Sequence, residues 1–374
     1  MNVLVVNAGS SSLKLRLLGP GDGLLASVDL HAREGRPDPG EVRSAIRGLA
    51  RLGTFQAVGH RIVHGGTTFT DPVVVTDQVI KDLRGLTALA PLHQPAALAA
   101  LTEVRTAAPD VVQVACFDTA FHARMPLAAF TYAVPADWRE RLGVRRFGFH
   151  GLSHAYASRR AATLTGGCRV VTCHLGSGAS LAAVRDGVGI DTTMGFTPLE
   201  GLVMSTRSGN IDPGLLLWLQ TSAGMSADEL TDKLFHRSGL FALAGTADMR
   251  TVVDRATAGD AAGSLALAVY LHRLRAQIAA MATALGGLDT LVFTGGVGER
   301  SAAVRAGAAD GLGFLGVGID PDRNTAHTDG DSDITDPGVA TSGVATSGSR
   351  VRTLVVEARE ELEIARGVRA CLAG

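Results

Sequence analysis

Two stretches far apart in the chain share a plan that constrains the fold more than any other feature. Residues 2–15 read NVLVVNAGSSSLKL and residues 170–180 read VVTCHLGSGAS. In each, an apolar run meets a small-residue turn that contains glycine, and a second strand follows. Glycines in such turns let backbone N–H groups approach a ligand closely, usually a phosphate. The repetition predicts two similar halves that face one ligand.

The order of elements after each glycine turn supports this duplication. The length of 374 residues favours two domains. Apolar strand-like runs alternate with segments of helical period, which is typical of an α/β fold. The strands are expected at 57–66, 111–117, 290–294 and 352–356, and helices at 41–52, 91–108, 261–285 and 359–372. Residues 325–349 carry four aspartates and a repeated GVATS, so they are predicted to be an exposed loop or a disordered insertion.

Composition excludes several classes of partner and location. Lys and Arg number 35 against 36 for Asp and Glu, and aromatic residues make up 5% of the chain, so neither nucleic acid nor a membrane surface is expected as a partner. The four cysteines lack a paired spacing, which favours a reducing, cytoplasmic setting. No signal peptide and no membrane-spanning stretch is predicted.

Charged residues beside glycine turns and at strand ends are the candidates for chemistry. Arg61 precedes HGG, and Arg207 lies within MSTRSGNIDPG. An arginine fork matches a carboxylate or phosphoryl group, so this pair could clamp an anionic substrate. Asp118, at the end of an apolar strand, and Glu360, at the start of the last helix, are candidates to hold magnesium. A purely structural placement of Glu360 in the first turn of a helix stays open.

Other motifs leave further alternatives open. The chain has no P-loop sequence, and VFTGGVGE at 292–299 is only a partial dinucleotide signature. The pairs His60/His64 and His150/His154 have the i, i+4 spacing of zinc ligands, but neither matches HExxH. A zinc hydrolase is therefore the least favoured alternative.

Ten motifs in family order make the chain resemble the acetate kinases, which are short-chain acid kinases of the acetate and sugar kinase/Hsp70/actin superfamily. They are NAGSSSLK (7–14), GHRIVHGG (59–66), PLHQP (91–95), FDTAFH (117–122), RFGFHGLSH (146–154), HLGSGAS (174–180), MGFTPLEGLVMSTRSGNIDPG (194–214), GTADMR (245–250), FTGGVGE (293–299) and EELEIAR (360–366).

The resemblance implies a two-domain actin-like, ribonuclease H-like α/β fold with duplicated βββαβαβα lobes and a central cleft. It places residues 1–118 with 361–374 in the N-terminal lobe and residues 119–360 in the nucleotide-binding lobe. It also implies a cytoplasmic homodimer and the reversible reaction of ATP with acetate to give ADP and acetyl phosphate. Mg²⁺ is the implied metal, with Mn²⁺ as an alternative.

Site residues follow from the same resemblance. It implies catalytic roles for Asp118, Arg61, Arg207 and His150, of which His150 and Arg207 stabilise the transition state. Asn7 and Glu360 are implied to hold the metal, with Ser10 and Ser12 beside Asn7 and with His93 near the phosphoryl group. Arg61 shares the acid pocket with Val63, Leu92, Phe149 and Pro198. The implied nucleotide-binding residues are Lys14, His174, Leu175, Gly176, Ser177, Gly178, Asp248, Met249, Arg250, Gly296, Val297, Gly298 and Glu299.

The chain departs from the family pattern at several positions, including a segment between Asp22 and Glu41 that is shorter than is typical, and two alternatives stay open. Ser177 replaces an asparagine, Asn210 replaces an aspartate, and Glu357-Ala358-Arg359 replaces Pro-Thr-Asn. A propionate or butyrate kinase would keep the motifs and change the acid pocket. A weakly active nucleotide-binding sensor of the same fold is the alternative that Ser177 motivates.

Overall fold

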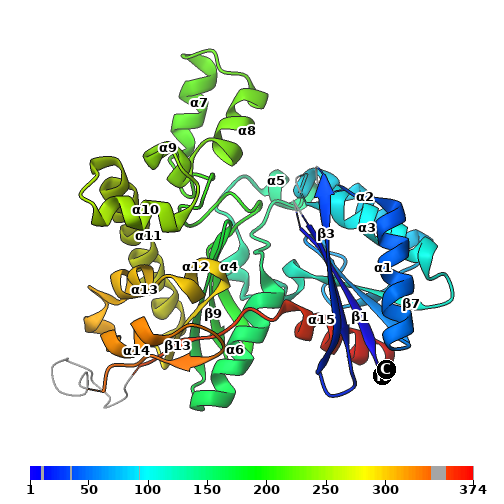
Figure 1. Ribbon diagram of the computed structural model, residues 1–374. Coiled ribbons are helices and arrows are strands. Elements are labelled where there is room, and N and C mark those ends of the chain that lie inside the picture. The colour runs from blue at the N-terminus through cyan, green and yellow to red at the C-terminus, as the bar shows by residue number, and fades with distance from the viewer. Residues whose placement is uncertain (10–11, 34–35, 92, 338–350, 374) are drawn as a thin grey trace. The chain divides into compact units, whose positions relative to one another are not determined.

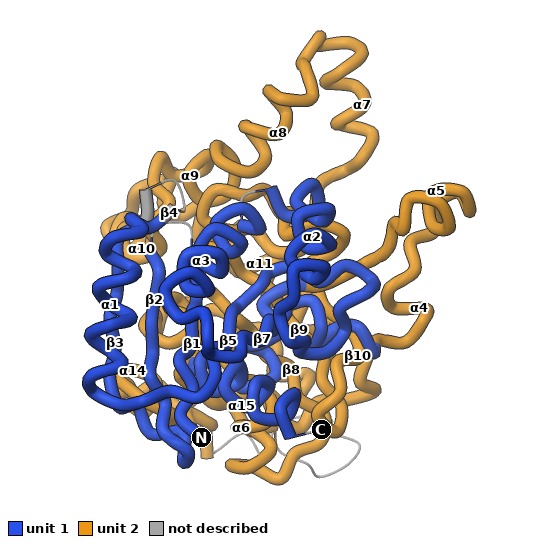
Figure 2. The backbone as a smooth tube through the Cα atoms, turned by 90° about the vertical axis from the view of Figure 1, so that its right-hand side faces the viewer, with its two compact units in different colours: residues 1–124, 149–156, 359–374 blue, residues 125–148, 157–358 orange. Residues whose placement is uncertain are grey.

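The computed structural model describes residues 1–9, 12–33, 36–91, 93–337 and 351–373 (Figure 1). The chain divides into two compact units, which Figure 2 colours separately. Unit 1 contains residues 1–124, 149–156 and 359–374, and unit 2 contains residues 125–148 and 157–358. Each unit is built on its own β-sheet.

The sheet of unit 1 has seven strands in the order β4-β3-β2-β1-β5-β7-β6. β1, β2 and β3 form an antiparallel meander, whereas β1, β5 and β7 run parallel. Residues 3–6 of β1 are all buried, as expected of a strand with helices on both faces. The strands are β1 (Val3–Ala8), β2 (Ser12–Leu18), β3 (Leu24–Arg33), β4 (Arg36–Pro37), β5 (Ala57–Ile62), β6 (Val73–Val74) and β7 (Val112–Phe117).

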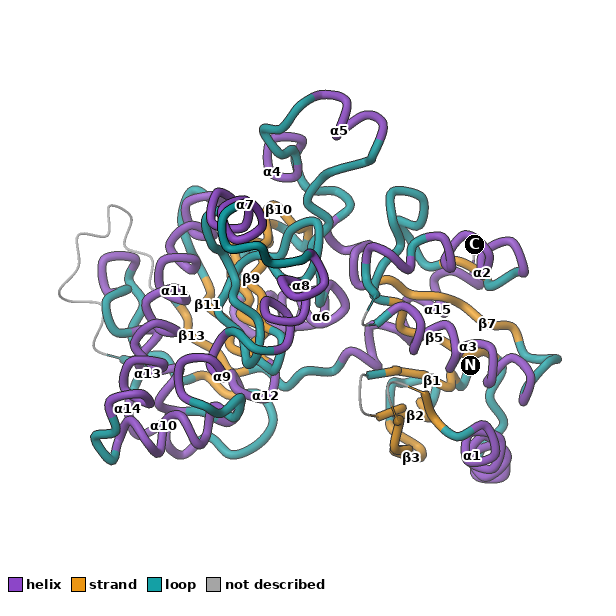
Figure 3. Tube along the Cα trace, turned by 90° about the horizontal axis from the view of Figure 1, so that it is seen from above, coloured by secondary structure: helices purple, strands orange, loops and turns teal. Residues whose placement is uncertain are grey.

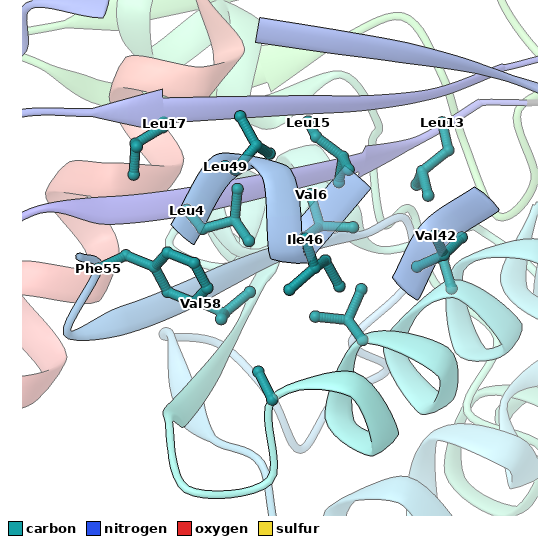
Figure 4. Packing of buried hydrophobic residues seen from close by; sticks show 13 residues of the cluster. Leu4, Val6, Leu13, Leu15, Leu17, Val42, Ile46, Leu49, Phe55 and Val58 are labelled. Atoms are coloured by element: carbon teal, nitrogen blue, oxygen red, sulfur yellow. The ribbon is translucent and has the colours of Figure 1, made fainter. Parts of the chain in front are cut away.

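One face of this sheet is covered by α1 (Pro39–Leu52) and α3 (Gln94–Ala107). Their apolar side chains pack with those of β1, β2 and β5 in the cluster shown in Figure 4. α1 begins at Pro39, where the Asp38 side chain accepts hydrogen bonds from the N–H groups of Gly40 and Glu41 at 2.8 and 2.9 Å. The unit also contains α2 (Asp77–Gly85) and the short 3₁₀ helices η1 (Thr87–Leu89) and η2 (Asp118–His122).

The opposite face is covered by α15 (Glu360–Ala373). This helix lies so close to β5 that a Cβ atom on Gly59 would be 2.6 Å from Ile364 and 2.7 Å from Val368. Such distances are too short for any side chain, so β5 needs glycine at this position. The close packing of α15 fixes the location of its first residue, Glu360.

Because unit 1 contains two buried histidines, we expect the free energy of unfolding to decrease at acid pH. Burial lowers the pKa of His60 and of His64 to about 4, well below the ordinary value near 6.5. As pH falls from about 6.5 to about 4, the unfolded chain takes up protons before the folded chain does, so the free energy of unfolding decreases. Two and a half pH units correspond to about 3 kcal/mol per histidine.

We therefore expect denaturant unfolding to show a clear loss of stability between about pH 7 and pH 4.5. His60→Phe, which replaces a titrating ring with a neutral one, should reduce the pH slope. An unchanged slope in this variant would contradict the account of His60.

The sheet of unit 2 repeats the plan in the order β10-β9-β8-β11-β13-β12. β8, β9 and β10 are antiparallel, and β8, β11 and β13 are parallel. The strands are β8 (Arg169–Leu175), β9 (Ala179–Arg185), β10 (Val188–Thr192), β11 (Thr290–Thr294), β12 (Ser332–Asp333) and β13 (Arg352–Val355). Both units thus carry a three-stranded meander followed by parallel strands, which confirms the predicted duplication.

Helices of unit 2 surround its sheet in Figure 3. The longest, α11 (Ala261–Leu285), has the predicted bounds, with Asp260 at its N-cap and Gly286 in the left-handed conformation at its C-cap. The capping box of Ser226 and Glu229 is present at the start of α8. The helices are α4 (Leu127–Phe130), α5 (Ala136–Arg141), α6 (Gly151–Thr165, which begins in unit 1), α7 (Pro213–Thr221), α8 (Ala227–His236), α9 (Gly239–Ala244), α10 (Met249–Thr257), α11, α12 (Gly295–Arg300), α13 (Ala302–Ala309), η3 (Gly313–Leu315) and α14 (Pro321–Ala326).

Residues 325–349 were predicted to be an exposed loop or a disordered insertion. The part that the structure describes, residues 325–337, differs from this prediction. β12 pairs with β13, and the side chain of Ile334 is fully buried, so residues up to 337 contribute to the core of unit 2. Asp333 forms an ion pair with Arg352. The GVATS repeat lies outside the described residues. Within the described chain, no helix combines the length and hydropathy that crossing a membrane requires.

Candidate active site

Three polar side chains of unit 1 meet where its parallel strands end. Asn7 is near the end of β1, Arg61 is the penultimate residue of β5, and Asp118 follows β7 directly. The carboxyl ends of parallel strands share one edge of a sheet, which is where ligands bind in α/β folds. α15 adds Glu360 from the face that it covers. Residues between 54 and 353 positions apart in the chain thereby come into contact.

Arg61 is the centre of this cluster. Its Nε and Nη2 atoms donate to Asp118 Oδ2 at 3.1 and 2.8 Å. Its Nη1 atom lies 3.1 Å from Glu360 Oε2 and donates to Asn7 Oδ1 at 3.3 Å. Asn7 Nδ2 in turn donates to Glu360 Oε2 at 2.9 Å. One guanidinium therefore bridges both carboxylates, which an ammonium group could not do with the same geometry.

Burial and charge shift the pKa values of the cluster. Burial alone would lower the pKa of Arg61, but the carboxylates of Asp118 and Glu360 raise it above its ordinary value. Burial also raises the pKa of Asp118 to about 6, with Glu360 adding to the rise and Arg61 opposing it. With two carboxylates and one guanidinium, the cluster carries a formal surplus of one negative charge.

The oxygen atoms of the cluster fit a hard divalent cation. The buried Oδ1 atom of Asp118 has no hydrogen-bond partner among the described residues. Mg²⁺ is commonly bound by one or two carboxylates together with substrate phosphates, and it retains several waters. The described residues contain no group of three or more His, Cys, Asp or Glu side chains arranged for a metal, so the predicted alternative of a protein-caged zinc ion gains no support. Asn7, Asp118 and Glu360 suit magnesium held jointly with a phosphate.

His150 lies at the start of α6 with an unusual backbone. Its φ angle is +54°, in the left-handed region that side chains with a Cβ atom rarely adopt. Phe149 is 1% exposed, and its ring meets the edge of the His64 ring at a centroid distance of 5.7 Å. Val63 is buried just after β5. Unit 1 therefore contains His150 and three of the predicted acid-pocket residues, Arg61, Val63 and Phe149, whereas Leu92 and Ser10 lie outside the described residues.

Unit 2 holds a pocket of about 420 Å³ at the glycine turns. Seven predicted nucleotide-binding residues line it: Gly176, Ser177, Asp248, Met249, Arg250, Gly296 and Val297. Arg300 and Asp254 line it as well and were not predicted. Two arginines beside glycine turns provide the positive charge and backbone N–H groups that suit a nucleotide.

The remaining predicted nucleotide-binding residues do not line this pocket. His174 and Leu175 end β8, and Gly178 accepts a hydrogen bond from Gly176 N–H at 3.0 Å across the turn. Glu299 is used structurally, since its Oε1 atom accepts from the N–H groups of Gly295 and Ala358, both at 2.9 Å. Gly298 is buried in α12. Lys14 is exposed on β2 of unit 1, in register with Asn7.

Arg207 and Pro198 belong to unit 2 and contact each other. Arg207 Nη1 donates to the carbonyl oxygen of Pro198 at 3.1 Å. No carboxylate of the described residues forms an ion pair with Arg207, and burial lowers its pKa. A half-buried guanidinium without a counter-ion is suited to bind an anionic ligand.

Hydrogen-bond networks of two arginines, which the sequence did not predict, hold these loops. Arg305, 1% exposed, donates to the carbonyl oxygens of Gly298 at 2.9 Å and Glu299 at 2.5 Å, and so fixes the glycine turn. Arg146 joins Glu200 at 2.6 Å, and so secures the loop that carries Arg207. Both arginines lie within or beside quoted motifs, but motif position alone does not reveal which groups they contact.

Comparison with known proteins identifies the family. The profile of the Acetokinase family matches residues 47–366. The chain belongs to this family. It is 43% identical over 415 residues to the acetate kinase of Synechococcus sp. (strain JA-2-3B'a(2-13)), with 100% of both chains covered. It is 44% identical over 404 residues to that of Clavibacter michiganensis subsp. michiganensis (strain NCPPB 382), with 100% of this chain and 99% of the relative covered.

Solved structures agree with the family assignment. The acetate kinase of Porphyromonas gingivalis superposes with a TM-score of 0.86 at 34% identity, covering 99% of each chain. A propionate kinase from Francisella tularensis subsp. tularensis SCHU S4 gives a TM-score of 0.87 at 34% identity, covering 98% of each chain. The fold is thus the actin-like fold of the acetokinase family, and the chain is a kinase that transfers phosphate to a carboxylate, with ATP and ADP as its nucleotides.

Proposed function

We propose that the chain transfers the γ-phosphoryl group of ATP directly to acetate, and that the cluster of Asn7, Arg61, Asp118 and Glu360 is its catalytic centre. An acetate oxygen attacks the γ-phosphorus in line, the bond from phosphorus to the β–γ bridging oxygen breaks, and ADP leaves with those electrons. The reverse reaction returns the phosphoryl group to ADP. The observation that carries the proposal is the bridging of Asp118 and Glu360 by the half-buried Arg61.

The proposal needs no general base. A carboxylic acid is already ionised at neutral pH, so the attacking oxygen of acetate carries no proton that must be removed. Catalysis therefore depends on alignment and on neutralising the charge of the transferring phosphoryl group. In this proposal Arg61 and Arg207 hold the acetate carboxylate and the phosphoryl oxygens, and His150 donates to those oxygens in the transition state.

Asn7 and Glu360 would hold Mg²⁺ or, as an alternative, Mn²⁺, with Asp118 beside them and near the attacking oxygen. The bound cation would supply positive charge to the β- and γ-phosphate oxygens. Arg61 orients both carboxylates by its hydrogen bond to Asp118 and its ion pair with Glu360. The described oxygen set supports magnesium because hard cations prefer oxygen ligands.

We place the nucleotide in the unit 2 pocket lined by Gly176, Ser177, Asp248, Arg250 and Gly296. In this proposal Asn7, Arg61, Asp118 and Glu360 of unit 1 bind the acid and the metal, and the pocket of unit 2 binds the nucleotide. The further residues proposed to contribute to nucleotide binding are Lys14, His174, Leu175, Gly178, Gly298 and Glu299. Glu299 acts through its hydrogen bond to the N–H group of Gly295 in the glycine turn.

Ser177 gives a prediction about nucleotide affinity. Its side chain is exposed at the pocket, at a position where the family resemblance implies the longer asparagine. Ser177→Asn should tighten ADP binding, measured by titration calorimetry, about 3- to 10-fold, which is the contribution of one net hydrogen bond. Ser177→Ala should not tighten it. If wild type and Ser177→Asn bound ADP with equal affinity, Ser177 would not cause any difference in nucleotide binding between this chain and its family.

Val63 gives a prediction about which chain length of the acid substrate is preferred. We propose that Val63 and Phe149 of unit 1 line the methyl pocket, with Leu92 and Pro198 as further proposed contributors, so Val63→Ala should make room for one more methylene. One methylene is worth about 1–3 kcal/mol, so the ratio of kcat/KM for propionate over acetate should rise about tenfold. Val58→Ala is the matched control, because it removes the same volume from a fully buried position in the core of β5. A ratio that rises equally in both variants would contradict the proposed pocket.

The chain is further proposed to be a cytoplasmic homodimer. α7 exposes Leu215, Leu217 and Trp218, with Trp218 at 57% relative exposure, and such an apolar surface suits contact with a second copy. Analytical ultracentrifugation of the full chain and of Trp218→Lys would test the dimer. A monomeric wild-type protein would contradict it.

The acid-series assay tests the function. Purified protein with ATP, Mg²⁺ and hydroxylamine should form acetyl hydroxamate from acetate fastest, with propionate slower and butyrate slowest. A preference for propionate or butyrate would favour the alternative that the Francisella propionate kinase represents. Nucleotide binding without hydroxamate formation would favour the sensor.

A further inference from the structure

We propose that His122 is a positioning residue for His150, because it holds the backbone carbonyl group that precedes His150. The inference rests on the proposed role of His150 in the transition state. It assigns a function to the histidine of the FDTAFH motif, which sequence analysis left without one.

The contact between the two segments is direct and buried. His122 is the last residue of η2 and is fully buried, and its Nε2 atom lies 3.0 Å from the carbonyl oxygen of Phe149. A carbonyl oxygen only accepts hydrogen bonds, so Nε2 of His122 carries the proton and donates it. Phe149 is itself 1% exposed, so losing this donor would leave its carbonyl oxygen without its bond and away from water.

The residue that follows Phe149 needs such a restraint. His150 has φ +54°, a conformation that is unfavourable for a residue with a Cβ atom. On its other side, a Cβ atom on Gly151 would lie 1.9 Å from the carbonyl oxygen of Asp118, so the backbone of Gly151 packs directly on η2. The backbone is thus held on both sides of His150 by η2, through His122 before it and Asp118 after it.

η2 therefore positions two residues of the site. Asp118 is its first residue and joins Arg61, whereas His122 is its last and holds the carbonyl before His150. A displacement of about 1 Å in a catalytic group can cost about 10²-fold in rate. Without the His122 bond, the backbone at His150 can relax toward a common conformation and shift the imidazole.

The first test compares substitutions at His122 in the full chain. His122→Phe keeps a ring but removes the donor, and should lower kcat about 10- to 100-fold with the KM values for acetate and ATP within about twofold. His122→Gln keeps an N–H donor at a similar reach and should recover much of the loss. His60→Phe is the control, since His60 is a fully buried histidine whose Nε2 pairs with Gln113 instead, 2.7 Å away. It should lower stability and leave kcat within about twofold.

The deciding test is a double-mutant cycle with His150→Ala. If His122 acts through His150, adding His122→Phe to His150→Ala should lower kcat by less than about twofold. An equal, multiplicative loss in that background would overturn the inference, as would an unchanged kcat in His122→Phe alone. A full kcat in His150→Ala would instead overturn the proposed role of His150. His122→Asn, whose amide is too short to reach Phe149 O, runs the same cycle if circular dichroism shows that His122→Phe is unfolded.

Discussion

Arg61→Ala should abolish nearly all phosphoryl transfer, with kcat reduced about 10³- to 10⁵-fold, the range that a single arginine contributes in phosphoryl-transfer enzymes. The substitution removes the guanidinium that contacts Asp118, Glu360 and Asn7. It leaves two neighbouring carboxylates without their counter-ion, so it should also lower the free energy of unfolding by about 3–5 kcal/mol. Steady-state kinetics and denaturant unfolding measure the two losses separately.

Two further variants test whether the effects of Arg61→Ala are specific to the guanidinium group at this position. Arg61→Lys keeps the charge but cannot bridge both carboxylates with one planar fork, so it should recover stability more than activity. Arg105→Ala removes an arginine of the same unit, paired with an Asp77 side chain that is 92% exposed, and should leave both quantities unchanged. Full activity in Arg61→Ala would contradict the central role of the cluster.

Arg207→Ala should lower kcat about 10³-fold or more without loss of stability. Arg207 differs from Arg61 because no carboxylate of the described residues pairs with it, and burial already lowers its pKa. Removing a half-buried charge that lacks a counter-ion should leave the melting temperature equal or slightly higher, as is common for groups kept for function.

Arg237→Ala is the matched control in unit 2, since Arg237 pairs with Asp232 and its side chain is 67% exposed. This variant should change neither kcat nor the melting temperature. If Arg207→Ala lost stability and activity together, a structural role for Arg207 would explain the data better than a catalytic one.

Much of the fold could be predicted because local patterns determine it. The glycine turn at Gly176 and Gly178, the long helix over 261–285 and the duplicated strand order all depend on neighbouring residues. The helix α10 and the short strand β12 were missed, whereas β13 was predicted. Asp248 caps α10 within a polar segment, and β12 is two residues long, so neither gives a clear periodic signal.

The site was only partly predictable for a different reason. Motifs identified Asn7, Arg61, Asp118 and Glu360 as candidates, but their hydrogen bonds join residues as far as 353 positions apart. The contact of His122 with Phe149 likewise depends on how η2 packs against the start of α6. Sequence spacing carries no information about such packing, since tertiary contacts decide it.

The most direct test of the account is the rate of acetyl phosphate formation by the purified full chain from ATP and acetate, with and without Mg²⁺, beside Arg61→Ala. The account predicts Mg²⁺-dependent turnover at ordinary kinase rates of about 1–100 per second for the wild type, and a loss of about 10³-fold or more in the variant. Turnover that is independent of Mg²⁺, or equal rates for wild type and Arg61→Ala, would contradict it.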